Sequence, residues 1–562
     1  MQHPAEAPAD EAEQCWADAL RQHHSGRLEA AERLYRRVLA ADPRHAEALH
    51  LLGVLAYQTQ RRDLALDLIG QAIGVAPDVA LFHPNLGNVL EALGRTEEAT
   101  ASHRRSVQLD PRFAEGHKLL GTLLLEQGRA EEAEACLRLA LEIRPDFAEA
   151  ENNLAGLLVR QNRVGEAADR YRRLIQGNQR DAQAHLHLGA ALLALDRLEE
   201  ATAALRQAVA LRRDWADALT RLGVAHMRAA NPAAAIPCFQ AVTRLNPDDP
   251  EAHVDLGLAL LLCGDMPAGW REFEWRRLTG AVIEKGRDYA RPQWRGEPAG
   301  HATLLIHAEQ GFGDMLQFCR YAPLAHDRGM RVIIEAPAPL LRLLRSLRGV
   351  EMLVASGEAL PPFDLHCPML SLPLAFATEM ADIPRSVPYL RADPAEAASF
   401  RMRLAAAAPA DGLRVGLAWA GNPEPEFDRR RSLDPDRLTR LGLVAGVQFV
   451  CLQEVAFPRP AGLTLIDLMD GVVDFAATAA LVANLDLVIS ADTAVVHLAG
   501  ALGKPVWLLN RFDNCWRWLT GREGSPWYPT LRIFRQPRPG DWDSVLADVE
   551  AALRALAGEV AT

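Results

Sequence analysis

The first half of the chain repeats with a period of 34 residues. Three columns of small or helix-ending residues keep the same phase along this period, which chance does not produce. The glycine column is Gly53, Gly87, Gly121, Gly189, Gly223 and Gly257, with Ala19 and Ala155 at two further positions. The alanine column is Ala31, Ala65, Ala99, Ala133, Ala167, Ala201 and Ala235. The proline column is Pro43, Pro77, Pro111, Pro145 and Pro247.

Each period is expected to form two antiparallel helices. The glycines and alanines let the helix backbones approach, and the proline ends the second helix because it cannot continue one. Stacked hairpins bury their apolar sides and build an α-solenoid with an extended concave groove. The pattern resembles the tetratricopeptide repeat, with seven units over about residues 11–247 and a partial eighth to 277. Such a groove typically binds a polypeptide, and a scaffold without a partner is the alternative.

The position two residues before the column glycine is expected to face the groove. It holds Leu51, Asn85, Leu119, Asn153, His187, Arg221 and Asp255. The O-GlcNAc transferases, which join this repeat to a sugar-transferring domain, carry an asparagine ladder there that grips the acceptor backbone. Only Asn85 and Asn153 supply asparagine here. The resemblance therefore implies a protein acceptor that is held in a different way.

The second half changes to short β-branched or aliphatic runs that alternate with helical stretches, which predicts parallel α/β layers. The expected strands are residues 303–307, 331–335, 414–418, 448–452, 487–490 and 505–509. We expect two Rossmann-like lobes, with chemistry in the loops after the strands. The predicted organisation is a tail (1–10), a solenoid (11–277), a capping linker (278–300), a first lobe (301–395) and a second lobe (410–562).

The loop after the first expected strand reads HAEQGFGDMLQF, residues 307–318. Gly311 and Gly313 permit close approach, and Gln310 lies beside them. Asp314 stands where a helix over 315–328 is expected to begin, so it is either a helix cap or a reactive carboxylate. The last glycine of a GxGxxG fingerprint is missing, which disfavours a dinucleotide oxidoreductase.

A strand–helix–strand unit follows in DLVISADTAVVHLAGALGKPVWLL, residues 486–509. Asp492 and Thr493 open the helix, and the N–H groups of Thr493, Ala494 and Val495 are expected to face the cleft as a diphosphate site. His497 follows one turn later, within reach of the same ligand. A histidine bonded within the core is the alternative reading of His497.

GFGDMLQF together with DTAVVHLAGALGKPVW resembles the bacterial heptosyltransferase group of inverting glycosyltransferases, which have the two-lobed GT-B fold. The whole chain is similar to bacterial proteins that fuse tetratricopeptide repeats to such a domain, among them flagellin glycosyltransferases. The resemblance implies that Asp314 is the catalytic base and that Asp492 contacts the donor. It also implies that Thr493 and His497 line the donor pocket.

Two further segments are candidates for the site. In WAGNPEPEFDRRRSL, residues 419–433, Arg429 and Arg431 are expected to hold a diphosphate and Asn422 to bond the nucleotide, unless the run is only a solvated charged surface. Residues 511–529 concentrate aromatics, among them Trp516 and Trp527, which form either a sugar or base platform or the packing of a long loop. The stretch 270–276 is expected to fasten the solenoid to the first lobe.

Composition excludes several classes of protein. The formal net charge of −12 has the wrong sign for binding nucleic acid by bulk electrostatics. No apolar run approaches the roughly 20 residues of a membrane span, and the acidic N-terminus lacks a signal pattern, so we expect a cytoplasmic protein. The eight cysteines form no CxxC pair. The only DxD-like string, Asp434-Pro435-Asp436, reads as a helix start, so neither a metal nor a cofactor is expected.

These observations together predict a glycosyltransferase that uses a nucleotide-sugar. The expected reaction moves the sugar onto a Ser or Thr of a protein acceptor in the repeat groove, with flagellin as a candidate acceptor. Two alternatives remain, namely transfer to a lipopolysaccharide or lipid-linked glycan, and a repeat scaffold with an inactive transferase domain.

Overall fold

The computed structural model describes residues 7–280, 289–309, 311–408, 412–421, 428–454 and 457–560. The predicted Gln310 and Asn422 therefore lie outside the described residues. The chain divides into two compact units, Met1–Arg212 and Arg213–Thr562, which are described separately. The second unit contains the last two helical hairpins together with the α/β region.

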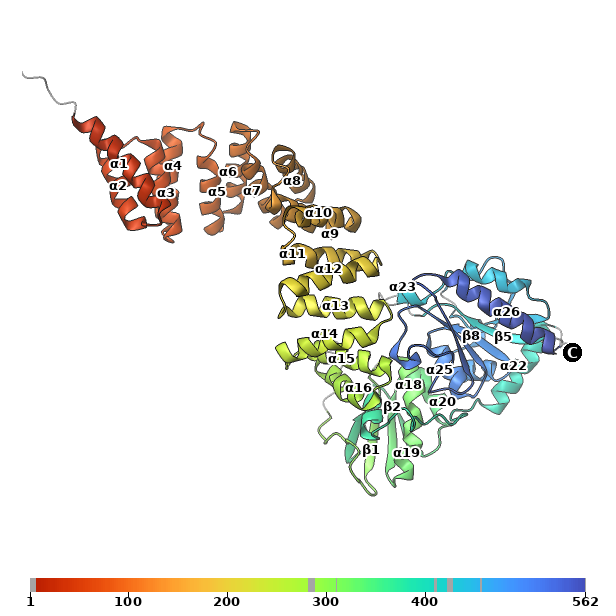
Figure 1. Ribbon diagram of the computed structural model, residues 1–562. Coiled ribbons are helices and arrows are strands. Elements are labelled where there is room, and N and C mark those ends of the chain that lie inside the picture. The colour runs from red at the N-terminus through yellow and green to blue at the C-terminus, as the bar shows by residue number, and fades with distance from the viewer. Residues whose placement is uncertain are drawn as a thin grey trace, which may run out of the picture. The chain divides into compact units, whose positions relative to one another are not determined.

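The first unit consists of helical hairpins, visible in Figure 1 as successive pairs of antiparallel helices. Its helices are α1 (Ala7–His24), α2 (Leu28–Ala41), α3 (Ala46–Gln58), α4 (Arg62–Val75), α5 (Phe82–Ala92), α6 (Thr96–Leu109), α7 (Ala114–Glu126), α8 (Ala130–Ile143), α9 (Ala148–Arg160), α10 (Val164–Gly177), α11 (Ala182–Ala194) and α12 (Leu198–Leu211). The predicted solenoid of two-helix repeats is confirmed.

Close helix packing explains the glycine column. A Cβ on Gly53 would lie 2.6 Å from Ile69 Cγ1, and one on Gly189 would lie 2.4 Å from Leu205 Cγ. The alanines of the second column, such as Ala65, are completely buried. Any larger side chain at these positions would force the two helices of a hairpin apart.

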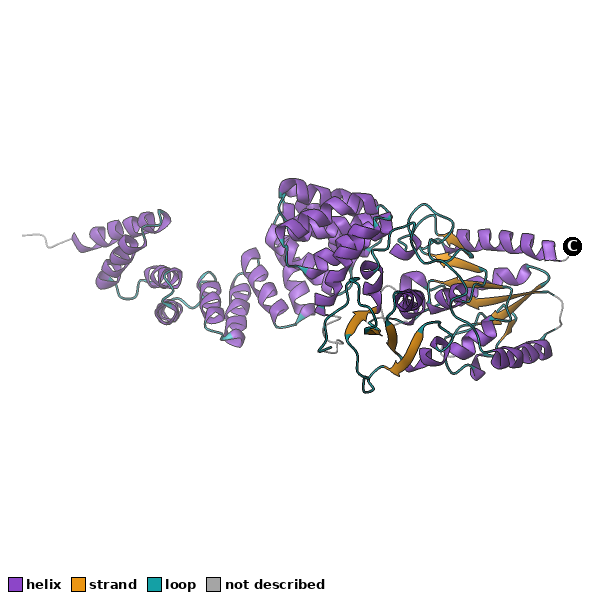
Figure 2. Ribbon diagram, turned by 90° about the horizontal axis from the view of Figure 1, so that it is seen from below, coloured by secondary structure: helices purple, strands orange, loops and turns teal. Residues whose placement is uncertain are grey.

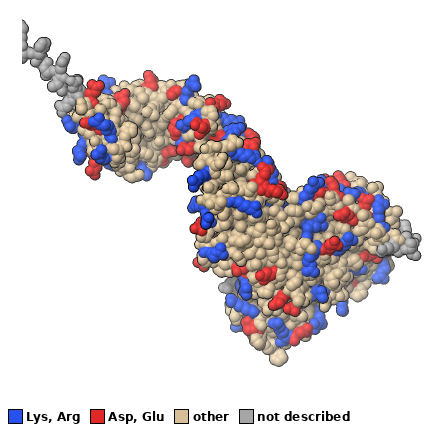
Figure 3. Space-filling view, viewed as in Figure 1, with Lys and Arg blue, Asp and Glu red and all other residues tan. Residues whose placement is uncertain are grey.

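Ion pairs between successive repeats run along the first unit. Arg61 binds Glu32 of the preceding repeat, and Arg163 binds Glu134 in the same way, each pair at 2.7 Å. Figure 3 shows the result as basic and acidic side chains interspersed over the surface of the first unit. Exposed pairs of this kind contribute at most about 1 kcal/mol each, so the apolar packing remains the main source of stability.

The two asparagines that were predicted to face the groove, Asn85 and Asn153, bond to the preceding repeat. Asn153 Nδ2 donates to Thr122 Oγ1 at 2.8 Å, and Asn85 Nδ2 lies 2.8 Å from His50 Nε2. Both amides are half-buried. In the second unit Asp255 occupies the equivalent position, and burial, reinforced by Asp249 and Glu251, raises its pKa to about 6.

The second unit begins with two further hairpins. They are formed by α13 (Ala216–Arg228), α14 (Pro232–Leu245), α15 (Pro250–Cys263) and α16 (Met266–Phe273), followed by the 3-10 turn η1 (Glu274–Leu278). Met266, Trp270 and Phe273 of α16 are buried in the same apolar core as the α/β region. The end of the repeat array is therefore built into this core.

The first lobe contains a four-stranded parallel sheet in the order β3-β2-β1-β4. The strands are β1 (Thr303–His307), β2 (Arg331–Ala336), β3 (Val350–Ala355) and β4 (Leu365–Pro368). Its helices are α18 (Phe312–Phe318), α19 (Ala322–Asp327), α20 (Ala338–Leu344) and α21 (Leu372–Ala375). The single helix expected over 315–328 is divided, because the 3-10 turn η2 (Cys319–Tyr321) separates α18 from α19.

The second lobe contains a six-stranded parallel sheet in the order β10-β9-β8-β5-β6-β7. Its strands are β5 (Leu413–Ala418), β6 (Val447–Cys451), β7 (Leu465–Ile466), β8 (Leu487–Ala491), β9 (Val506–Asn510) and β10 (Leu531–Arg535). Its helices are α22 (Pro394–Ala407), α23 (Asp428–Arg431), α24 (Phe475–Val482), α25 (Ala494–Ala501) and α26 (Trp542–Val560). Figure 2 shows the strands of both sheets surrounded by helices.

Both sheets reverse their strand order beside the first strand of the lobe, between β1 and β4 and between β5 and β8. If the strands of the second lobe are numbered from 1 along the chain, beginning with β5, their order in the sheet is 3-2-1-4-5-6, as in dinucleotide-binding folds. The predicted fold class is confirmed as a repeat solenoid followed by an α/β region of two parallel sheets, consistent with GT-B. No described helix has the length and apolar character needed to cross a bilayer.

Candidate functional site

A large cavity lies where both sheets reverse their strand order. Its volume is about 1000 Å³, and its walls are loops that follow β1, β5, β6, β8 and β9. In parallel sheets of this kind, ligands bind outside the carboxyl ends of the strands at the point of reversal. The cavity therefore lies where the topology of both lobes predicts a site.

The first lobe contributes Gly311, Gly313 and Asp314 to the cavity. Gly311 occupies the cap position of α18, and no side chain caps this helix. Asp314 is the third residue of α18, so the alternative reading of Asp314 as the helix cap is wrong. Its carboxylate is half-buried in the wall of the cavity.

Gly313 brings the two lobes into close contact. A Cβ at this position would lie 2.9 Å from Cδ2 of His497, which belongs to α25. His497 is held in turn by Tyr528, whose hydroxyl is 3.0 Å from Nδ1, and by the indole of Trp518 stacked on its ring. The imidazole has little room to move, so only glycine fits against it.

Gly313→Ala is expected to lower the activity of this site at least tenfold and stability by about 1–3 kcal/mol, because the added methyl overpacks the contact between α18 and α25. Gly311→Ala is the matched control, since a Cβ there meets only Asp314 Oδ2 at 3.9 Å. Kinetics and thermal unfolding of the two variants check this expectation. Equal losses in both would show that the contact with His497 has no special importance.

Asp314 is paired with Arg517, which comes from the second lobe. Nη2 of Arg517 donates to Asp314 Oδ1, and Nε donates to Gln317 Oε1 at 2.9 Å. The guanidinium also lies over the Trp516 ring, 4.5 Å from its centroid. Burial alone would lower the pKa of Arg517, but Asp314, Cys515 and Asp492 together outweigh burial and raise it. The carboxylate is thus oriented only when both lobes are together.

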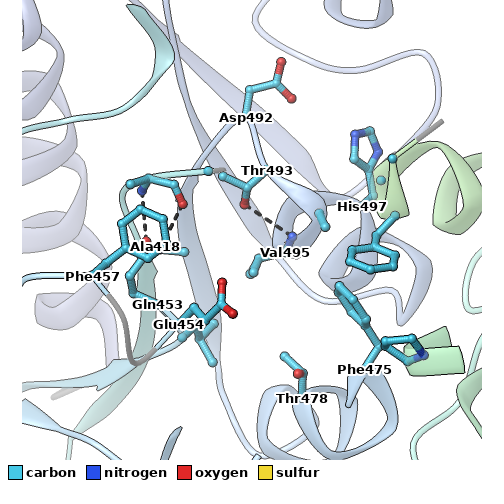
Figure 4. A pocket seen from close by; sticks show the side chains of 18 of the residues that line it. Ala418, Gln453, Glu454, Phe457, Phe475, Thr478, Asp492, Thr493, Val495 and His497 are labelled. Carbon is cyan, nitrogen blue, oxygen red and sulfur yellow. Dashed lines mark hydrogen bonds between the residues drawn. The ribbon is translucent and has the colours of Figure 1, made fainter. Parts of the chain in front are cut away.

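The second lobe contributes the start of α25. Asp492, Thr493, Ala494 and Val495 line the cavity, as predicted from their position after β8. The N–H of Val495 differs from the prediction that it faces the cleft. It donates a hydrogen bond of 3.3 Å to Thr493 Oγ1, as Figure 4 shows. The Val495 N–H is therefore already bonded rather than open to a ligand.

His497 is both a core residue and a cavity residue. Burial, reinforced by the positive charges of Arg517, Arg320 and Arg431, holds the pKa of its imidazole well below the ordinary value. The ring is therefore neutral, and its bond to Tyr528 fixes its orientation. His497 is therefore bonded within the core and also lines the cavity, so both interpretations of this residue from the sequence apply.

Three arginines line the cavity, together with the carboxylates of Asp314, Glu454, Asp474 and Asp492. Arg431, from the short helix α23, lines it as expected. Arg511 and Arg517 line it as well and were not predicted. The side chain of Arg429 lies outside the described part of the structure. Three guanidinium groups and a helix start suit an anionic group such as a diphosphate.

Gln453 is a further residue that sequence reasoning missed. Its side chain accepts from the N–H groups of Trp419 and Ala420 at 2.9 Å each and donates to the Ala420 carbonyl at 3.0 Å. These bonds fix the loop after β5 against the loop after β6 (Figure 4). The two loops come together because β5 pairs in parallel with β6. No local sequence motif could therefore identify Gln453 as a site residue.

Part of the cavity wall is apolar. Phe312 of the first lobe lies against Phe475 of the second, with ring centroids 5.1 Å apart, and Phe457 and Val473 continue this wall. Val473 is 81% exposed, so the apolar surface reaches the mouth of the cavity. The cavity therefore combines arginine side chains with an aromatic surface.

Trp516 and Trp527 do not contribute to the described cavity lining. Both indoles are buried, at 5% and 0% exposure, and they pack against Trp270 and Phe318. Of the two alternatives for these indoles, the structure therefore shows the packing of a long loop and not a platform in the cavity. The described residues contain no cluster of three or more His, Cys, Asp or Glu side chains suited to a metal ion.

Comparisons with known proteins agree with this division of the chain. Models of the tetratricopeptide repeat match residues 23–84, 90–157, 152–218 and 220–269, and the model of glycosyltransferase family 9 (heptosyltransferase) matches residues 466–510. The latter segment contains β8, α25 and the residues that line the cavity between β8 and β9. The chain thus contains tetratricopeptide repeats and a segment that matches glycosyltransferase family 9, which supports a glycosyltransferase.

Among individual proteins, the chain is similar to Protein FlbA of Caulobacter vibrioides (strain ATCC 19089 / CIP 103742 / CB 15), with 28% identity. The match covers 58% of this chain and 59% of FlbA, so it spans less than two thirds of that relative.

Solved structures also resemble parts of the chain. YrrB, a TPR protein with an unusual peptide-binding site, is 22% identical, with a TM-score of 0.31, and the match covers 33% of this chain and 95% of YrrB. PilF of Pseudomonas aeruginosa is 20% identical, with a TM-score of 0.33, and the match covers 37% of this chain and 94% of pilF.

Proposed function

We propose that this chain is a protein O-glycosyltransferase. It transfers a sugar from a nucleotide-sugar to a Ser or Thr hydroxyl of a protein acceptor bound by the repeats. The observation that carries the proposal is that Asp314 and the start of α25 line one cavity although they belong to different lobes. A carboxylate facing an anion-binding wall is the arrangement that sugar transfer from a nucleoside diphosphate requires.

The proposed reaction is a single displacement with inversion. The acceptor hydroxyl oxygen forms a bond to the anomeric carbon while the bond from that carbon to the diphosphate oxygen breaks. Asp314 takes the hydroxyl proton, and the nucleoside diphosphate leaves with the electron pair of the broken bond. Arg431, Arg511 and Arg517, with the dipole of α25, stabilise the negative charge on the leaving group. In this scheme the chain needs no cofactor besides the nucleotide-sugar.

The aromatic side of the cavity supports a nucleotide donor. Phe312, Phe457 and Phe475 offer ring faces for the apolar surface of a nucleobase or sugar, while the arginines attract the phosphates.

Flagellin is the acceptor to test first, since the sequence resembles repeat-fused flagellin glycosyltransferases. Mass spectrometry of flagellin and total protein from cells with and without the gene tests the proposal. A sugar mass on Ser or Thr peptides that disappears without the gene supports it. A change confined to lipopolysaccharide or lipid-linked glycans would assign the chain to the heptosyltransferase-like alternative, and no change in any glycan would favour a scaffold.

A further inference from the structure

The last turn of the repeat array makes an unusual buried contact with the first lobe. Arg276, in η1, is only 3% exposed. Its Nη2 donates to both carboxylate oxygens of Glu309, at 3.1 and 2.9 Å, and to Ser371 Oγ at 2.8 Å. Its Nη1 donates to Glu274 Oε2 at 3.1 Å and to the Phe273 carbonyl at 3.2 Å. The guanidinium thus joins η1 to two loops of the first lobe.

Glu309 belongs to the loop that carries Asp314. It follows β1 by two residues and precedes the cap residue of α18, Gly311, by two. Its Oε2 also accepts from the N–H of Leu370, beyond β4, at 3.1 Å. The bonds of Glu309 therefore span β1 and β4, where the sheet of the first lobe reverses its strand order.

The loop is held at both ends by arginines from other parts of the unit. Arg276 of the repeat array binds Glu309 at the start, and Arg517 of the second lobe binds Asp314 at the end. The two anchors, Glu309 and Asp314, lie five residues apart in the chain, so a shift of Glu309 can reach the Asp314 carboxylate. A displacement of about 1 Å in a reacting group can cost on the order of a hundredfold in rate.

Fastening the repeats to the lobe does not by itself require this charged network. Met266, Trp270 and Phe273 already bury the end of the array in the shared apolar core. Buried ion pairs can often be replaced by apolar residues without loss of stability. Attachment of the repeats to the lobe therefore does not explain why these charged residues are buried here. Burial alone would lower the pKa of Arg276, but the carboxylates of Glu309 and Glu274 outweigh it, and the guanidinium stays charged.

We propose that Arg276 is a positioning residue that holds the Asp314 loop through Glu309. The terminal turn of the repeat array is then part of the support of the candidate active site, in addition to fastening the array. The consequence for sugar transfer rests on the function proposed above. The effect of Arg276 on the order of the loop is independent of that function.

Arg276→Lys in the full-length chain tests the proposal, because lysine keeps the charge but cannot form the fork to Glu309, Ser371 and the main chain. Arg277→Lys is the matched control, since Arg277 also pairs with Glu274 but bonds Gln293 instead of the loop. Hydrogen exchange of amides 308–318 is expected to be about tenfold faster in Arg276→Lys and unchanged in Arg277→Lys.

The kinetic measurement uses a nucleotide-sugar that the unmodified protein turns over. Arg276→Lys is expected to lower kcat by about 10- to 100-fold, with KM for the donor within about twofold. If Arg276→Lys does not fold, Ser371→Ala removes one bond to Arg276 without leaving a charge unpaired, and faster exchange confined to 308–318 is again expected.

Two results would overturn the proposal. One is equal exchange of 308–318 in Arg276→Lys and Arg277→Lys. The other is faster exchange spread evenly over the strands of the first lobe, which would show a fastening role alone. An unmodified protein that transfers no sugar would contradict the proposed function instead, and the exchange measurement would still decide whether Arg276 positions the loop.

Discussion

Asp314→Asn is expected to lower kcat for sugar transfer by about 10²- to 10⁴-fold, because asparagine cannot take the proton of the acceptor hydroxyl. Asparagine has nearly the volume of aspartate, and its amide oxygen can still accept from Arg517, so the cavity keeps its shape. Affinity for nucleoside diphosphates is expected to change by no more than about threefold. Steady-state kinetics and calorimetric titration with UDP, GDP, ADP and CDP measure the two quantities.

Asp327→Asn is the matched control for this variant. Asp327 is also an aspartate of the first lobe that pairs with an arginine, Arg348, at 2.7 Å, but it is exposed and outside the described cavity lining. Its replacement is expected to leave kcat unchanged. Full activity in Asp314→Asn would remove Asp314 from the role of base. Loss of nucleotide affinity together with kcat would instead place the carboxylate in donor binding.

The elements nearest the site were the most predictable from sequence. β1, β5 and β8 are buried along nearly their whole length, so each appears as a mainly apolar run in the sequence. Strands at or near the sheet edges were missed for the opposite reason. β3 exposes Glu351 and Met352 and shows no such run, and β7 has only two residues. The sequence predicted the loops of the cavity because they follow the buried strands.

The contacts that complete the site could not be predicted from sequence. Arg517 meets Asp314 across 203 residues of chain, and Arg276 meets Glu309 across 33. Periodicity and local motifs describe neighbours along the chain and carry no information about which distant loops converge. The aromatic segment 511–529 was recognised as unusual, yet two of its arginines, Arg511 and Arg517, reach the cavity rather than Trp516 or Trp527.

Deletion of residues 1–212 is expected to lower modification of an intact protein acceptor at least about 100-fold, because it removes most of the groove that would bind the acceptor. The cut falls between the two compact units and leaves α13–α16, Arg276 and the whole cavity in place. Affinity for the nucleotide is therefore expected to stay within about threefold of the full-length value. Calorimetry and mass spectrometry of the acceptor measure these two effects.

A longer deletion, of residues 1–277, provides the contrast. It also removes Met266, Trp270 and Phe273 from the shared core and Arg276 from the Asp314 loop, so we expect poor folding and loss of nucleotide binding. A short peptide that contains the acceptor site separates affinity from chemistry, because the 1–212 deletion should modify it as fast as the full-length chain does. If the 1–212 deletion modified the intact acceptor at the full rate, the repeats of the first unit would have no part in acceptor selection.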